Sequence, residues 1–126
     1  MDIAVLQKLK VLYVEDEIEL RNTTFNSFSV FVNDVVVASN GKEGLALFTS
    51  EEFDVVITDL SMPVMTGIEM IEEIRKLNNS IPIIVTTAFG SQNEEVIELT
   101  KIGMTTYLMK PVDVRELITT IYEVVT

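Results

Sequence analysis

Residues 55–63 of the chain read VVITDLSMP, and this stretch decides the fold. Its first four residues are a continuous run of branched side chains, which stops at Asp59 and a turn-forming sequence. Apolar runs of the same kind recur at residues 11–14, 35–38, 83–87 and 107–109. Four of the five runs are continuously apolar rather than alternating, which is typical of parallel strands covered by helices on both faces. The sequence therefore predicts a five-stranded parallel sheet.

Segments with helical periodicity separate these runs. The clearest apolar stripe lies in residues 114–125, and weaker stripes are marked by Ile68, Ile71, Ile74 and Leu77 and by Phe25, Phe28 and Val32. Each predicted helix begins with a capping residue that is followed three positions later by a glutamate. The five pairs are Asp16/Glu19, Asn40/Glu43, Thr66/Glu69, Ser91/Glu94 and Asp113/Glu116. The chain thus alternates strand and helix five times.

This alternation predicts an α/β fold with right-handed crossovers and helices on both faces of the sheet. A closed barrel would need eight strands, so five strands favour the flavodoxin-like (βα)5 three-layer sandwich, a parallel sheet in the order 2-1-3-4-5. We expect one domain over residues 1–126, with about residues 1–9 as an N-terminal extension.

The composition limits the kinds of partner and metal site that the chain can have. The chain has 20 acidic and 9 basic residues, a net charge of -11, which disfavours direct binding to nucleic acid. It has no cysteine and no histidine, so metal sites built from these residues and histidine acid–base chemistry are excluded, and any metal must be bound by oxygen atoms. No apolar run is long enough to cross a membrane, and residues 1–10 lack a signal-peptide pattern. We therefore expect a cytoplasmic protein.

Polar residues useful for phosphoryl transfer stand where the inner strands end. Glu15 and Asp16 follow the first strand, Asp59 ends the third, Thr87 the fourth, and Lys110 follows the fifth. In the order 2-1-3-4-5 the first and third strands are neighbours, so the three carboxylates should meet at one edge of the sheet. A carboxylate placed between a divalent metal, an ammonium and a hydroxyl is arranged to attack phosphorus.

Each of these residues also has an ordinary structural interpretation. Asp16 alone is better explained as a helix N-cap, Asp59 as the start of a turn, and Lys110 as a surface lysine. Glu15 fits a solvated strand end and Thr87 an ordinary strand position. Together, these interpretations do not explain why every inner strand ends in a group suited to phosphoryl transfer.

At this point the sequence resembles the response-regulator receiver domain of two-component signalling. The resemblance rests on four motifs in order and covers the chain from about Lys10 onward. The motifs are Val14-Glu15-Asp16-Glu17, Asp59-Leu60-Ser61-Met62-Pro63 with Gly67, Thr87-Ala88, and Tyr107-Leu108-Met109-Lys110-Pro111. One departure is the acidic pair, which is Glu-Asp where Asp-Asp is commoner in the family.

The resemblance implies a role for each matching residue. Asp59 would be the phosphoacceptor, Thr87 and Lys110 would hold the phosphoryl oxygens, and Tyr107 would be the aromatic that turns on activation. Mg²⁺, with Mn²⁺ as the alternative, would be bound by Asp16, Asp59 and the backbone carbonyl of Ser61, and by Glu15 through water. The family also implies a cis bond before Pro111.

The resemblance also implies a signalling switch rather than an enzyme with a separate substrate, although the domain would assist its own phosphorylation and dephosphorylation. The phosphoryl donor would be a histidine kinase or a phosphotransfer protein. Activation would change the surface formed by the fourth helix, fifth strand and fifth helix of the (βα)5 unit. We expect Ser61 and Phe89 at the mouth of the pocket, where access of water would set the lifetime of the phosphoryl group. Phe89 would either shield that group from water or only pack against the start of the fourth helix of the (βα)5 unit.

Three other functions remain to be compared. A metal-dependent phosphatase with an aspartyl nucleophile needs a second acid two residues after it, where this chain has Ser61. A flavin-binding electron carrier needs a phosphate-binding loop after the first strand, where Glu15 and Asp16 would repel phosphate. A binding module of the same fold that is never phosphorylated stays open.

Overall fold

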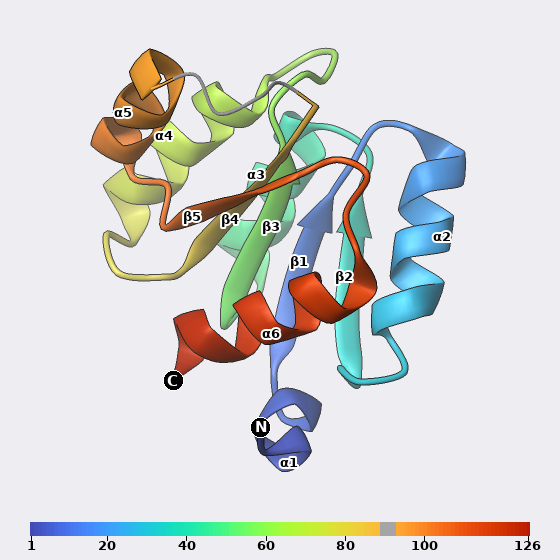
Figure 1. Ribbon diagram of the computed structural model, residues 1–126. Coiled ribbons are helices and arrows are strands. Elements are labelled where there is room, and N and C mark those ends of the chain that lie inside the picture. The colour runs from blue at the N-terminus through green and yellow to red at the C-terminus, as the bar shows by residue number, and fades with distance from the viewer. Residues whose placement is uncertain (89–92) are drawn as a thin grey trace.

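The computed structural model describes residues 1–88 and 93–126, which form a sheet with helices on both faces (Figure 1). The strands are β1 (Lys10–Val14), β2 (Asp34–Ala38), β3 (Val55–Asp59), β4 (Ile83–Thr87) and β5 (Thr106–Met109). The helices are α1 (Ile3–Gln7), α2 (Ile18–Phe28), α3 (Gly41–Ser50), α4 (Gly67–Leu77), α5 (Asn93–Ile102) and α6 (Val114–Val125). All strand pairs are parallel and the order is β2-β1-β3-β4-β5, so the predicted flavodoxin-like fold is confirmed.

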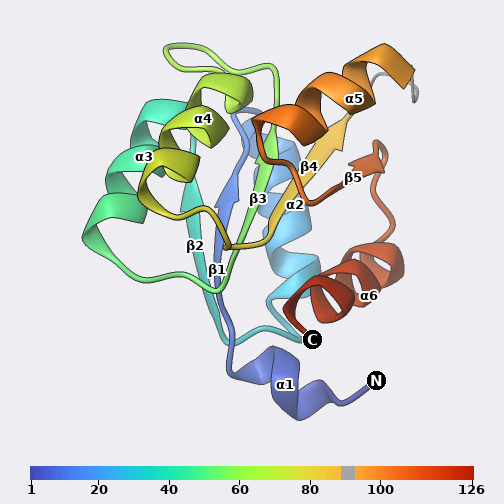
Figure 2. The same ribbon diagram turned by 90° about the vertical axis from the view of Figure 1, so that its left-hand side faces the viewer.

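The sheet separates two apolar cores. One core packs α3, α4 and α5 against one face, and the other packs α1, α2 and α6 against the opposite face. Figure 2 views the sheet from the side, with α3 and α4 on its left and α6 on its right. Every residue of β3 and β4 is buried, which explains why these runs carry no hydrophobic alternation. Because β1 and β3 are parallel neighbours, their carboxyl ends lie side by side at one edge of the sheet.

The predicted helix caps are mostly present. Asn40 and Thr66 each accept a hydrogen bond from the backbone N–H three residues on, and Thr66 forms a complete capping box with Glu69. Asp113 also caps its helix, accepting from the N–H of Arg115 at 2.7 Å. The prediction of Asp16 as a cap is wrong, because the N-cap residue of α2 is Glu17, whose side chain makes no capping hydrogen bond. Ser91 lies outside the described residues.

The apolar face of α4 differs from the predicted stripe. Ile71 and Ile74 are buried as expected, but Ile68 and Leu77 are 40% and 62% exposed. Met70 is fully buried instead. With Gly67, the buried residues follow the i, i+3, i+4, i+7 pattern of one helical face, and Ile68 and Leu77 lie at its edges.

A short helix, α1, was not predicted from the sequence. Its N-cap Asp2 accepts a hydrogen bond from the N–H of Ala4 at 3.0 Å. Leu6 is fully buried and Leu9 is 8% exposed, and both join the core beneath α2 and α6. Figures 1 and 2 both show α1 close to the C-terminal end of α6. The region predicted as an N-terminal extension thus contributes directly to the core.

We expect Leu6→Ala to destabilise the protein by about 2–4 kcal/mol, since it removes a buried side chain and leaves a cavity. Ile3→Ala on the same helix is the matched control, because Ile3 is 49% exposed and its loss should cost within about 0.5 kcal/mol. Urea unfolding of both variants measures the difference. Equal costs for the two variants would mean that α1 does not hold the core.

Candidate phosphoacceptor site

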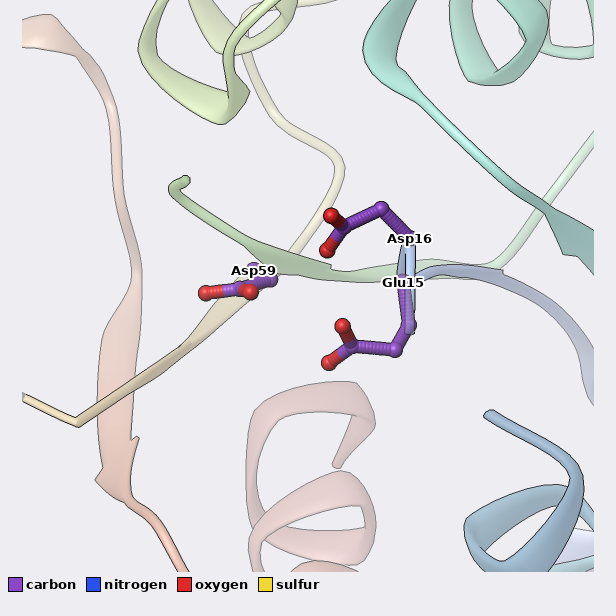
Figure 3. A group of neighbouring side chains, drawn as sticks. All are labelled: Glu15, Asp16 and Asp59. Carbon is purple, nitrogen blue, oxygen red and sulfur yellow. The ribbon is translucent and has the colours of Figure 1, made fainter. Parts of the chain in front are cut away.

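Three carboxylates meet at the carboxyl ends of β1 and β3. Val14 pairs with Thr58, so the residues that follow, Glu15 and Asp59, lie side by side. One oxygen from each of Glu15, Asp16 and Asp59 lies within 4.8 Å of the others. Figure 3 shows the carboxylates of Glu15 and Asp16 turned toward the side on which Asp59 lies. The predicted convergence of carboxylates is therefore present.

The environments of these carboxylates differ. Glu15 is 1% exposed and Asp59 is 8% exposed, while Asp16 is the most open of the three. Burial raises the pKa of Glu15, and the hydrogen bond from Lys110 counteracts part of that rise. Asp59 accepts a hydrogen bond from its neighbour, with the Leu60 N–H 2.7 Å from its Oδ1. Two of the three acids, Glu15 and Asp59, are thus held away from water beside the more open Asp16, which favours a cation among them.

Lys110 places its ammonium between the two buried acids. Its Nζ lies 2.9 Å from Glu15 Oε1 and 3.1 Å from Asp59 Oδ2. Burial alone would lower the pKa of Lys110, but its hydrogen bonds to the two carboxylates outweigh that effect and the pKa is raised. Lys110 therefore stays protonated and carries a fixed positive charge beside Asp59. The bond between Lys110 and Pro111 is cis, as the family resemblance implied.

The other predicted site residues lie around this cluster. Thr87 ends β4 one residue beyond Thr86, the register partner of Asp59, and is 6% exposed. Ser61 is exposed two residues after Asp59. Tyr107 pairs with Val85 on β4 and packs against the core beneath α3, α4 and α5. Phe89 lies outside the described residues, so the shield remains a prediction.

One residue that holds the site was missed by the sequence reasoning. Arg21 on α2 donates a hydrogen bond from Nη1 to the backbone carbonyl of Glu15 at 2.8 Å. The Glu17 N–H also donates to Glu15 Oε2 at 3.2 Å. These bonds fix the turn between β1 and α2 and so orient both acids. An arginine six positions after a glutamate is no recognised signal, because the contact depends on how α2 leaves the strand.

Residues 11–122 match the response regulator receiver domain family. The chain is 39% identical over 117 residues to the probable transcriptional regulator ycf27 of Guillardia theta, covering 93% of this chain and 45% of that protein. It is 33% identical to the regulatory protein AtoC of Escherichia coli, covering 86% of this chain and 23% of AtoC. Among solved structures, the chemotaxis protein CheY4 of Vibrio cholerae is similar with a TM-score of 0.86 at 33% identity, covering 92% of this chain and 98% of that chain.

The chain belongs to the response regulator receiver domain family of two-component signalling. The acidic cluster of Glu15, Asp16 and Asp59 fits the phosphorylation site of that family. The phosphatase and flavin-carrier alternatives are not favoured by these similarities. The chain spans less than half the length of each of these two regulatory proteins. No helix within the described ranges is long and apolar enough to span a membrane.

Proposed function

We propose that this domain accepts a phosphoryl group on Asp59 from a histidine kinase or a phosphotransfer protein. The observation that carries the proposal is the position of the Asp59 carboxylate, which lies among two further acids and 3.1 Å from the Lys110 ammonium. A carboxylate oxygen of Asp59 would form a bond to phosphorus while the bond from phosphorus to the donor's leaving atom breaks. The electron pair of the broken bond would stay on the leaving atom of the donor, and Asp59 would become an acyl phosphate.

Lys110 and Thr87 support this transfer in different ways. The Lys110 ammonium would offset the charge that gathers on the phosphoryl oxygens in the transition state. The Thr87 hydroxyl would donate a hydrogen bond to one of these oxygens once the group is in place. Because Lys110 already holds Asp59, its charge needs little rearrangement during the reaction. In this way the domain would assist its own phosphorylation and dephosphorylation without turning over a separate substrate.

The residues present fit a Mg²⁺ ion, with Mn²⁺ as the alternative. The donors are carboxylate oxygens from Glu15, Asp16 and Asp59, which hard divalent ions prefer. Asp16, Asp59 and the Ser61 backbone carbonyl would hold the ion directly, and Glu15 would hold it through water. When bound, the ion would add a second positive charge to that of Lys110 and so help to offset the charge on the phosphoryl oxygens.

Phosphorylation would then be communicated to the surface formed by α5, β5 and α6. Thr87 would move toward the phosphoryl oxygens, and Tyr107 would turn into the space beside it. A new charge at one edge of the sheet would bias a two-state element some distance away. A downstream output domain or protein would recognise that surface. The net charge of -11 disfavours direct nucleic-acid contact by this domain.

The experiment that tests this function is labelling of the chain by a small phosphodonor with Mg²⁺ present. One phosphoryl group should be added, and Asp59→Asn should abolish the labelling because an amide oxygen is a far weaker nucleophile. Asp34→Asn is the matched control, since Asp34 is exposed at the start of β2, and it should be labelled like the native chain. Full labelling of Asp59→Asn, measured by intact mass, would refute the assignment.

Mg²⁺ should also raise the melting temperature of the domain relative to a chelator. Binding to the folded state alone stabilises by about 2.7 kcal/mol when the ion is present at about one hundred times its dissociation constant. Asp16→Asn should remove most of this gain, because it takes away one ligand without emptying the core. Thermal melts of native chain, Asp16→Asn and Asp34→Asn measure it. The site is misassigned if Asp16→Asn keeps the full shift.

A further inference from the structure

A cavity of about 630 Å³ lies on the face of the sheet that α2 and α6 cover. Its floor is made by buried residues of the sheet and α6, namely Tyr13, Ile57, Thr86 and Leu117. Its rim is exposed and runs between α2 and the segment from β5 to α6, with Thr23, Ser27 and Val114. This volume falls in the range of small-molecule sites, and a buried floor with an open rim gives a ligand a way in.

The cavity exists because of the residues that α2 turns toward the sheet. The side chains of α2 that line it are Leu20, Thr23, Thr24 and Ser27, so three of the four are small hydroxyl residues. Within α2 only Phe28 is buried. Large apolar side chains at these positions would fill the space between helix and sheet, as they do beneath α4. The composition of α2 therefore leaves a void where the other face of the sheet is closely packed.

A buried hydroxyl in the lining lacks a partner. Thr86 is 5% exposed, and its Oγ1 makes no hydrogen bond with protein atoms in residues 1–88 and 93–126. A buried polar atom without a partner is unfavourable, and such groups in native proteins often mark a ligand or an ordered water. Nearby, burial raises the pKa of Tyr13 to about 12, so its phenol is neutral and the floor is a weakly polar environment.

The charges around the cavity decide which ligands fit. Among the described residues, those that line the cavity include no carboxylate to pair with a cation. Within the same described part of the chain the one charged lining residue is Lys110, whose ammonium is already shared by Glu15 and Asp59. The chain as a whole carries a charge of -11, which repels anions. The remaining class is uncharged molecules with an apolar body.

We propose that this cavity binds a small uncharged molecule whose apolar body packs on Ile57 and Leu117 and whose hydroxyl or carbonyl group hydrogen-bonds to Thr86. The site is distinct from the phosphoacceptor site but shares Lys110 with it. A ligand seated there lies against the side chain that holds the Asp59 carboxylate. The domain would in this way respond to the binding of a small molecule as well as to phosphorylation.

The test compares two probes of the same shape, p-cresol and p-xylene, on the unphosphorylated chain. Titration followed by NMR should show saturable binding of p-cresol, with contacts between its ring protons and the methyl groups of Ile57 and Leu117. Thr86→Val keeps the shape of the side chain and removes its hydroxyl. It should weaken p-cresol by about three- to tenfold, the effect of one hydrogen bond, and leave p-xylene unchanged or tighter.

Thr49→Val is the control, because Thr49 is an exposed residue of α3 on the opposite face of the sheet, and it should change neither affinity. The proposal is overturned if p-cresol shows no saturable binding, which would mean that the cavity holds only water. It is equally overturned if the probe contacts other residues, or if Thr86→Val weakens both probes alike. Phosphodonor labelling of Asp59 is measured separately, so a failure of ligand binding and a failure of the proposed function are distinguishable.

Discussion

Lys110→Met should destabilise the domain by about 3–5 kcal/mol at neutral pH without Mg²⁺, the range for removing one partner of a buried ion pair. The ammonium of Lys110 is the cation shared by Glu15 and Asp59, at 2.9 and 3.1 Å. Methionine has a similar volume and keeps the packing, but it leaves two neighbouring acids with no opposing charge. One of them, Glu15, is 1% exposed and has little access to solvent. Urea unfolding of the variant and the native chain measures the loss.

The same variant should regain stability relative to the native chain as the pH falls. Burial already raises the folded-state pKa of Glu15, and Lys110 is the main group that lowers it. Without Lys110 the pKa rises further, so the folded state binds a proton at a pH where the unfolded state does not. An acid of this kind lowers stability when it is ionised. The penalty begins to shrink as the pH falls below its folded-state pKa and is gone below its unfolded-state pKa. The difference between variant and native chain should therefore shrink toward acid pH.

Lys76→Met is the matched control. Lys76 also pairs with a carboxylate, Glu73 at 2.8 Å, but its side chain is 70% exposed on α4. An exposed pair of this kind contributes about 0–1 kcal/mol, so this variant should stay close to the native stability with no strong pH dependence. If both lysine variants lose the same free energy of unfolding, the acids at the strand ends are solvated well enough to need no cation.

Most of the site could be predicted from the sequence because its residues end strands. Asp59, Glu15 and Lys110 each stand at or just after the end of an apolar run, and parallel strands bring their carboxyl ends to one edge. The strand order then made β1 and β3 neighbours, which is enough to place the carboxylates together. The sharing of Lys110 between two acids was not predictable, because it depends on the reach and rotamer of one long side chain.

The features that escaped prediction depend on tertiary packing. Helix α1 is only five residues long, too short to be stable alone, and it is held by burial of Leu6 and by Leu9, which follows it. Asp16 was predicted both as a helix cap and as a member of the acidic cluster, and only the cap is wrong, because α2 begins one residue later, after Glu17. The α2 cavity likewise depends on which small residues face the sheet. Local patterns carry no information on such contacts.

Gly67 lies at the point where the loop after Asp59 enters α4, and it has almost no room for a side chain. A Cβ atom there would overlap the backbone carbonyl of Asp59 and lie 2.9 Å from the Cα of Leu60. The Gly67 N–H also donates to the Leu60 carbonyl at 2.9 Å, so loop and helix are joined directly. Since backbone cannot turn aside as a flexible side chain can, any larger residue must displace the end of β3 at Asp59 or the start of α4.

Gly67→Ala should therefore cost about 3 kcal/mol, the upper part of the range for overpacking, even though alanine favours a helix. It should also slow phosphodonor labelling of Asp59 by about tenfold or more, because displacement of the reacting group by about 1 Å can cost about a hundredfold in rate.

Gly44→Ala in α3 is the control. A Cβ there meets only side-chain atoms, the Met70 sulfur at 2.8 Å and a Val14 methyl at 2.9 Å, and the sulfur can move. Its cost should be smaller and its labelling rate near native, since neither contact involves the Asp59 backbone. Unfolding curves and labelling time courses of the two variants measure these differences. A Gly67→Ala chain as stable and as quickly labelled as Gly44→Ala would show that this loop does not hold Asp59 in place.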